Sequence, residues 1–400
     1  MNPASAMRPR PSTPVRTLPL GATLLLVPAL LLGAACDRAP DAPTAPADEA
    51  APASPDESSA PGAATSAEES AAEPEPEAEP EPEPEPPRFN AAGSHEPLNE
   101  ATRALVWGTP EDDRPEVLQA SREDLEGRHY LYSDEENLAL FHEHLDGLGG
   151  AYMGVGTDQL YLFAGWMRPE LAFATDYDAW VRELHFIYLA FFERAETIEA
   201  FIDLWHARNY RENRDWLREH FADHAERQLL LTVFERAHHL VHRRMGRIQR
   251  MGRAHGVPTF VSDPEQYAFV RNLVLAGRIR PTLSNLLDDT SLVALSAMLR
   301  EAGVPLRAFY ISNAEEYWAY PEQFRINMAA LPFDERGVLL RTSASKPRNG
   351  DYRYNLQTAA SFQAWVAHEN TRRHLDFYDR PHVRDEDHIP FSITDHLPGD

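Results

Sequence analysis

Two glycines and three polar residues stand together near the middle of the chain, where an apolar run ends and a helical pattern begins. Glycine lets the backbone turn sharply and approach a ligand without a Cβ in the way, and the N-terminus of the following helix presents free N–H groups. We expect this loop to bind a nucleoside-type small molecule, although a plain tight turn before a helix is the alternative. The candidate ligand-binding residues of this loop are Gly154, Gly156, Thr157, Asp158 and Gln159.

A second apolar run follows the loop and ends at Asp176. An acid at the tip of the next strand can accept hydrogen bonds from both hydroxyls of a ribose, so Asp176 completes the candidate ligand-binding set. Capping of the next helix is the other role open to Asp176, with Asp178 as an alternative cap. Asp158 has two roles open as well, since it could face a cationic ligand group or complement the helix dipole.

Other polar residues suggest weaker candidates. Arg280 could reach an anionic group of a substrate, or it could pair with one of the many carboxylates, which is the role that we favour for Arg341. His238 and His242 stand four apart, but the glutamate of a zinc-binding His-Glu-x-x-His motif is missing, so we expect no metal site. His185 lies in an apolar helical pattern and is expected in the core.

The segments around the loop alternate between helix and strand. Ser133 and Glu136 have the spacing of a capping box and predict a helix that leads to Gly149. An apolar run predicts a strand at residues 306–311, and residues 337–342 and 352–357 are predicted as the next strands, in addition to those on either side of the glycine loop. Residues 209–303 are mostly helical in pattern and strongly charged, and we interpret them as a helical insertion that caps the crevice. The alternation predicts an α/β fold.

The N-terminus has the order of a secretory signal peptide. Residues 1–35 contain three arginines, then an apolar run over 18–32, then small residues directly before Cys36. Cys36 is the only cysteine of the chain, which favours a lipoprotein signal with Cys36 as the lipidated residue over an ordinary signal peptide. The expected location is the cell envelope, outside the cytoplasm, with the lipid anchor as the contact to the membrane.

Composition divides the rest of the chain in two. Residues 36–88 are rich in proline, glutamate and alanine and have almost no large apolar side chain, so we expect a disordered tether. Residues 89–400 contain no second linker and are expected to form a single domain. The net charge of −25 makes nucleic acid a poor partner.

Three stretches together resemble a family of uncharacterised bacterial proteins whose fold is similar to that of S-adenosylmethionine-dependent methyltransferases. The resemblance covers roughly residues 120–360 and implies a Rossmann-like, mostly parallel sheet with its crevice at the carboxyl ends of the strands. In such folds the position after the later strand faces the acceptor substrate, so the resemblance makes Asn313 and Glu315 the catalytic candidates. The stretches are residues 154–159 with the strand that ends at 176, residues 310–317, and residues 327–332 followed by 338–342.

Two classes of function remain open. One is a methyltransferase-like transferase that uses S-adenosylmethionine or another nucleoside-type ligand. The other is a binding or interaction lipoprotein that keeps the fold without methyl transfer. Methyltransferases usually place an acid two positions before the first loop glycine, where this chain has Tyr152. S-adenosylmethionine is made in the cytosol, whereas the signal peptide directs this domain out of it. The missing acid and the predicted export both favour the second class.

Overall fold

A computed structural model describes residues 96–119, 125–344, 350–378 and 388–399, all of which belong to one compact unit. The predicted signal peptide, the predicted tether and Cys36 lie outside the described residues. Among the described helices, none is both long enough and apolar enough to cross a membrane.

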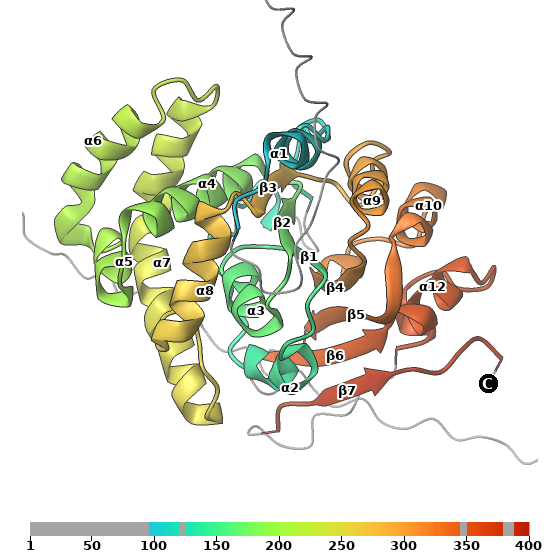
Figure 1. Ribbon diagram of the computed structural model, residues 1–400. Coiled ribbons are helices and arrows are strands. Elements are labelled where there is room, and N and C mark those ends of the chain that lie inside the picture. The colour runs from blue at the N-terminus through green and yellow to red at the C-terminus, as the bar shows by residue number, and fades with distance from the viewer. Residues whose placement is uncertain (1–95, 120–124, 345–349, 379–387, 400) are drawn as a thin grey trace, which may run out of the picture. The chain divides into compact units, whose positions relative to one another are not determined.

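Within the described ranges, the strands form one seven-stranded sheet in the order β3-β2-β1-β4-β5-β6-β7 (Figure 1). Neighbouring strands from β3 to β5 run parallel, β6 runs antiparallel to β5, and β7 is parallel to β6. This confirms the predicted α/β fold with a Rossmann-like, mostly parallel sheet. The strands are β1 (Ala151–Val155), β2 (Leu171–Asp176), β3 (Ile279–Leu283), β4 (Leu306–Ser312), β5 (Phe333–Ala344), β6 (Tyr352–Thr358) and β7 (Phe391–Thr394).

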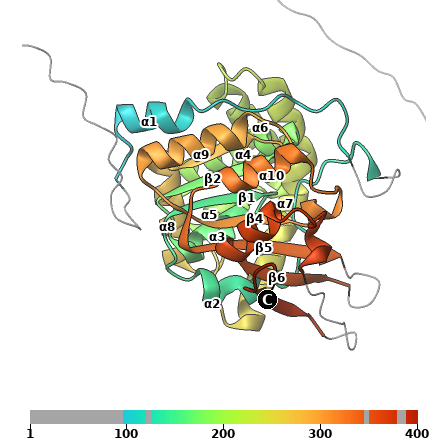
Figure 2. The ribbon, with the colours of Figure 1, turned by 90° about the vertical axis from the view of Figure 1, so that its right-hand side faces the viewer.

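Helices cover both faces of the sheet, because a parallel sheet buries its two faces. One face carries α2, α3, α4, α7 and α8 and shares a core with Tyr152 of β1, whereas the other carries α1, α9, α10 and α12 and shares a core with Met153. On the second face, α9 and α10 lie side by side (Figure 2). The α-helices are α1 (Glu100–Trp107), α2 (His142–Leu145), α3 (Gln159–Met167), α4 (Ala179–Arg194), α5 (Ile198–Leu204), α6 (Tyr210–His220), α7 (Arg227–His255), α8 (Pro264–Leu275), α9 (Ser291–Ala302), α10 (Glu322–Ala330) and α12 (Ala359–Ala367).

The order of the strands places a topological switch point between β1 and β4. The chain passes from β1 through α3 to β2 on one side, and β4 pairs with β1 on the other. In open α/β sheets, ligands bind at such a point outside the carboxyl ends of the strands. The loop from Gly156 to Asp158 lies there, between β1 and α3.

The structure differs from the expectation for residues 209–303. Helices α6, α7 and α8 do lie in this range, but Ile279–Leu283 form β3, which pairs with β2. No apolar run marked this strand, because it contains Arg280 and Pro281. Proline is tolerated since β3 is the outermost strand of the order, where one side of its backbone needs no ladder partner. Helix α7 packs on α4 as part of the core of one face of the sheet, rather than as a separate cap.

The predicted helix at residues 133–148 is also different. Ser133 and Glu136 do not form a capping box; the 3-10 helix Leu138–Phe141 and the short α2 begin only after them. The Ser133 hydroxyl instead accepts a hydrogen bond from the backbone N–H of Glu135 at 3.1 Å and donates to the Glu135 carboxylate. Residues 133–137 therefore form an irregular segment before the first helical turn.

Candidate functional site

Glu135 lies at the switch point, and its carboxylate is the centre of a buried polar cluster. Only 3% of the residue is exposed. Tyr310 of β4 donates its hydroxyl to Oε1 at 2.5 Å, and Ser312 at the end of the same strand donates to Oε1 at 3.0 Å. Gln159 at the start of α3 donates to Oε2 at 2.8 Å. The Glu135 carboxylate thus bridges α3 and β4, with Thr342 of β5 at 3.4 Å as a weaker donor.

The two β4 donors, Ser312 and Tyr310, each have an unusual property. Ser312 has a φ of 55°, a left-handed conformation that is unfavourable for a residue other than glycine, and this conformation accompanies the bond from its hydroxyl to Glu135. Burial, together with the negative charge of Glu135, raises the pKa of the Tyr310 hydroxyl well above its ordinary value. Tyr310 therefore remains protonated and acts as a donor.

A buried ion pair lies beside this cluster. The Nε of Arg244, from α7, donates to Asp158 at 2.8 Å, and Arg244 Nη1 donates to the backbone carbonyl of Glu135 at the same distance. Asp158 also accepts the backbone N–H of Ser133 at 3.0 Å. Burial opposes the charge on Arg244, but the adjacent Asp158 carboxylate raises the pKa of the guanidinium. Through these two contacts, Asp158 connects the 133–136 segment and α7 to the glycine loop.

The backbone N–H groups of the glycine loop already have partners within the chain. Gly156 N donates to Asp176 Oδ2 at 3.1 Å, and Thr157 N donates to the side chain of Gln159 at 3.0 Å. His185, which is fully buried, donates from Nε2 to the Gly156 carbonyl at 2.8 Å. Burial lowers the pKa of His185 to about 4, so the ring is neutral and is the core histidine that we expected.

The two glycines serve different purposes. Gly156 has a φ of 99°, which requires glycine. At Gly154, an added Cβ would lie 2.5 Å from the hydroxyl oxygen of Tyr152, so this glycine makes room for a buried tyrosine.

Asp176 lies at the tip of β2 as expected, but both of its oxygens are bonded within the chain, to Gly156 N and to Asp178 N at 2.9 Å. Burial, reinforced by the nearby Asp178 charge, raises the pKa of Asp176 to about 7. Asp178 is the N-cap of α4, since it accepts the backbone N–H of Trp180 at 2.9 Å. His129 contacts Asp178 through Nδ1 at 2.8 Å and stacks on Trp180.

The catalytic candidates do not join this cluster. The Glu315 carboxylate is buried and pairs with Arg341 Nε at 2.7 Å. The Arg341 guanidinium lies close to Phe362 and Phe377, on the opposite side of the sheet from Tyr310. Asn313 lies at the N-terminal end of the 3-10 helix Ala314–Glu316, and its amide is 3.4 Å from the carboxylate of Glu316. The sheet therefore separates the Glu315 carboxylate from that of Glu135.

Arg280, the candidate for substrate binding, is only 4% exposed and donates to two backbone carbonyls, one in the last turn of α1 and one just after the helix. Its Nη1 lies 2.6 Å from the carbonyl oxygen of Val106, and its Nη2 bonds to that of Thr109. Burial lowers the pKa of Arg280. The side chain ties α1 to β3 and leaves little of its surface for a ligand.

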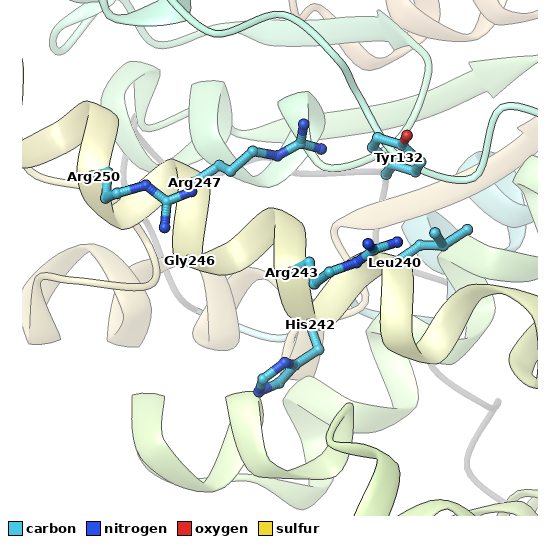
Figure 3. A pocket seen from close by; sticks show the side chains of 7 residues that line it. All are labelled: Tyr132, Leu240, His242, Arg243, Gly246, Arg247 and Arg250. Atoms are coloured by element: carbon cyan, nitrogen blue, oxygen red, sulfur yellow. The ribbon is translucent and has the colours of Figure 1, made fainter.

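A second polar site lies on the outer surface of α7, where a pocket of about 460 Å³ opens between α7 and the 131–136 segment (Figure 3). One tyrosine and three arginines are among its lining residues: Tyr132, Arg243, Arg247 and Arg250. The pocket arises only when the fold places Tyr132 beside the arginines of α7, which stand more than 100 residues further along the chain.

The key members of both sites were not predicted as functional. Glu135 and Arg244 stand 109 residues apart in the chain, so no local pattern links them.

Residues 130–392 match the family described as a domain of unknown function, DUF7790, and the chain belongs to that family. Comparison with curated proteins finds no match for this chain.

Proposed function

We propose that this chain is a lipid-anchored binding protein of the cell envelope that keeps a Rossmann-like fold without methyl transfer. The observation that carries the proposal is the position of the Glu135 carboxylate at the β1–β4 switch point, where its donors come from α3, β4 and β5. A ligand in the crevice would have to displace these bonds, and breaking a hydrogen bond to a buried charge costs about 1.5–3 kcal/mol.

The residues present do not fit S-adenosylmethionine. Tyr152, which replaces the usual acid before the loop, is fully buried beneath the loop and cannot hold an ammonium group. Gly156 N and Thr157 N, which a nucleotide-type ligand would use, donate to Asp176 and Gln159. Asp158, the other candidate for a cationic ligand group, is already paired with Arg244.

The anchoring part of the proposal rests on the sequence. The order of arginines, apolar run and small residues before the sole cysteine favours lipidation of Cys36. The acidic tether that follows would hold the folded domain away from the membrane surface by proline stiffness and charge repulsion.

Equilibrium binding of S-adenosylmethionine and a panel of nucleosides to the full-length protein in detergent tests the proposal. We expect no binding and no change in melting temperature, because a ligand that binds only the folded state must raise its apparent stability. Saturable binding of S-adenosylmethionine that Glu135→Ala alters would overturn it. A negative control is the Glu335→Ala variant, which removes an exposed carboxylate of β5.

One observation favours the alternative, a nucleoside-type ligand bound through residues 154–159. Asp176 is the last residue of β2 and lies at the tip of the strand, the place of a ribose-binding acid. In that case wild type would bind a nucleoside, and Asp176→Asn would weaken the binding by roughly 1.5–3 kcal/mol. Unchanged affinity in Asp176→Asn would exclude this role.

A further inference from the structure

We infer that the pocket beside α7 binds the phosphate group of a small molecule. The inference deepens the proposed binding function by naming a ligand class and a site for it. We call the site the α7 arginine pocket, defined by its lining residues Tyr132, Leu240, His242, Arg243, Gly246, Arg247 and Arg250.

The helix places the three arginines on one side. Arg243, Arg247 and Arg250 are spaced by four and three residues, which puts them on the same face of α7. Figure 3 shows the guanidinium groups of Arg243 and Arg247 extending from α7 in the direction of Tyr132, whereas His242 turns away. Like charges at this spacing repel each other, so the face is unfavourable until an anion neutralises it.

The pocket has more positive charge than its neighbours balance. Arg243 and Arg250 are exposed and have no hydrogen bond or ion pair with any residue that the structure describes. Arg247 pairs with Glu136 at 3.1 Å, and its buried Nε has no hydrogen-bond partner within the described chain. A surplus of guanidinium groups is unexpected on a protein with a net charge of −25.

The chemistry of these side chains selects the ligand. Guanidinium groups bind phosphate through pairs of parallel N–H donors, and they keep their charge at all physiological pH values. The Arg247 guanidinium lies 5.0 Å from the centre of the Tyr132 ring, and this stacking orders it in the free protein. A volume of about 460 Å³ suits a small molecule, with the Tyr132 ring and Leu240 to contact its apolar part.

The phosphate could belong to a soluble metabolite or to a lipid headgroup. Calorimetric titration of the full-length protein in neutral detergent with glycerol 3-phosphate and with short-chain phosphatidylglycerol separates these sources. Binding of the first assigns a soluble phosphate ester, and binding of the second alone assigns a headgroup. Binding of neither overturns the inference.

The decisive variant is Arg243→Gln with Arg250→Gln, since both side chains are exposed and their replacement should not affect folding. We expect the affinity to fall roughly tenfold or more, because a hydrogen bond to a charged group is lost with each arginine. The matched control is Arg236→Gln with Arg253→Gln, which removes two exposed arginines of the same helix outside the pocket. Equal weakening in both double variants would show nonspecific attraction and overturn the site.

A third variant should act in the opposite direction. Glu136→Gln removes the carboxylate that competes for Arg247, so we expect binding to tighten roughly twofold to fivefold. Weaker binding in Glu136→Gln would contradict the inference. The proposed function and this inference can fail separately. S-adenosylmethionine binding that changes on replacement of Glu135 but not of Arg243 would overturn only the proposed function.

Discussion

The hydroxyl of Tyr310 donates to the carboxylate of Glu135 at 2.5 Å, although 175 residues separate the two in the chain. This contact joins an irregular segment that precedes β1 to the carboxyl end of β4. It lies at the switch point, the place where Rossmann-like folds bind their ligands.

Replacing Glu135 should show how far the hydrogen bonds to its carboxylate stabilise the fold. Glu135→Gln keeps the shape of the side chain but turns an amide N–H₂ toward donors, so we expect a loss on the order of 3 kcal/mol in the free energy of unfolding. Urea denaturation measures it. Glu136→Gln is the control, since it breaks only a partly exposed pair with Arg247 and should cost under about 1 kcal/mol. Similar losses in the two variants would contradict the central role of Glu135.

The buried pair of Arg244 and Asp158 should show strong coupling. Arg244→Met leaves the Asp158 carboxylate buried without its cation, which should cost about 3–5 kcal/mol. Adding Asp158→Asn removes the unpaired charge, so the double variant should be more stable than Arg244→Met alone. Denaturation of the single and double variants tests this, and simple addition of the two losses would show that the pair is not coupled.

Asp176 should make stability depend on pH. Its folded-state pKa of about 7 is above its ordinary value, so the folded state binds the proton more tightly than the unfolded chain does. The contribution to stability is therefore full below about pH 4 and is lost as the pH rises through about 7, a change on the order of 4 kcal/mol. Asp176→Asn should remove this component of the pH dependence, as thermal melts between pH 4 and pH 8 would show. Asp215→Asn on the exposed side of α6 should leave the slope unchanged.

Gly156 should matter for its backbone angles. Gly156→Ala forces a Cβ into a φ of 99° and to 3.2 Å from the Gln159 amide, so we expect a loss of about 1–3 kcal/mol without an effect on the binding of any ligand. Gly246→Ala in α7 is the contrasting variant, because its Cβ meets only an ordinary contact and alanine favours a helix. A stable Gly156→Ala variant that fails to bind a nucleoside bound by wild type would favour the crevice instead.

Cys36 should decide where the protein is found. We expect Cys36→Ser to stay unprocessed and to lose lipid attachment, because serine has no thiol to modify. Cell fractionation and mass spectrometry of the mature N-terminus measure both effects. Ser58→Ala in the predicted tether should behave as wild type. Unchanged processing of Cys36→Ser would refute the lipoprotein interpretation.

Local patterns determined the class of fold. The strand predicted at residues 352–357 corresponds to β6. The mostly apolar run at residues 306–311 corresponds closely to β4, and the run that ends at Asp176 is β2, because strands buried on both faces need largely apolar residues. The outer strand β3 has Arg280 and Pro281 in that place and was missed for the same reason. The N-terminal signal is likewise a local property of residues 1–36.

Only the tertiary structure decided what the polar residues contact. The positions of Gly156 and Asp176 followed from the sequence, but their mutual hydrogen bond did not. Glu315 lies three residues after Ser312, yet their side chains have different partners, Arg341 for the first and Glu135 for the second. A buried charge must find its counterpart wherever the packed chain brings one, and local periodicity does not encode partners that are far apart in sequence.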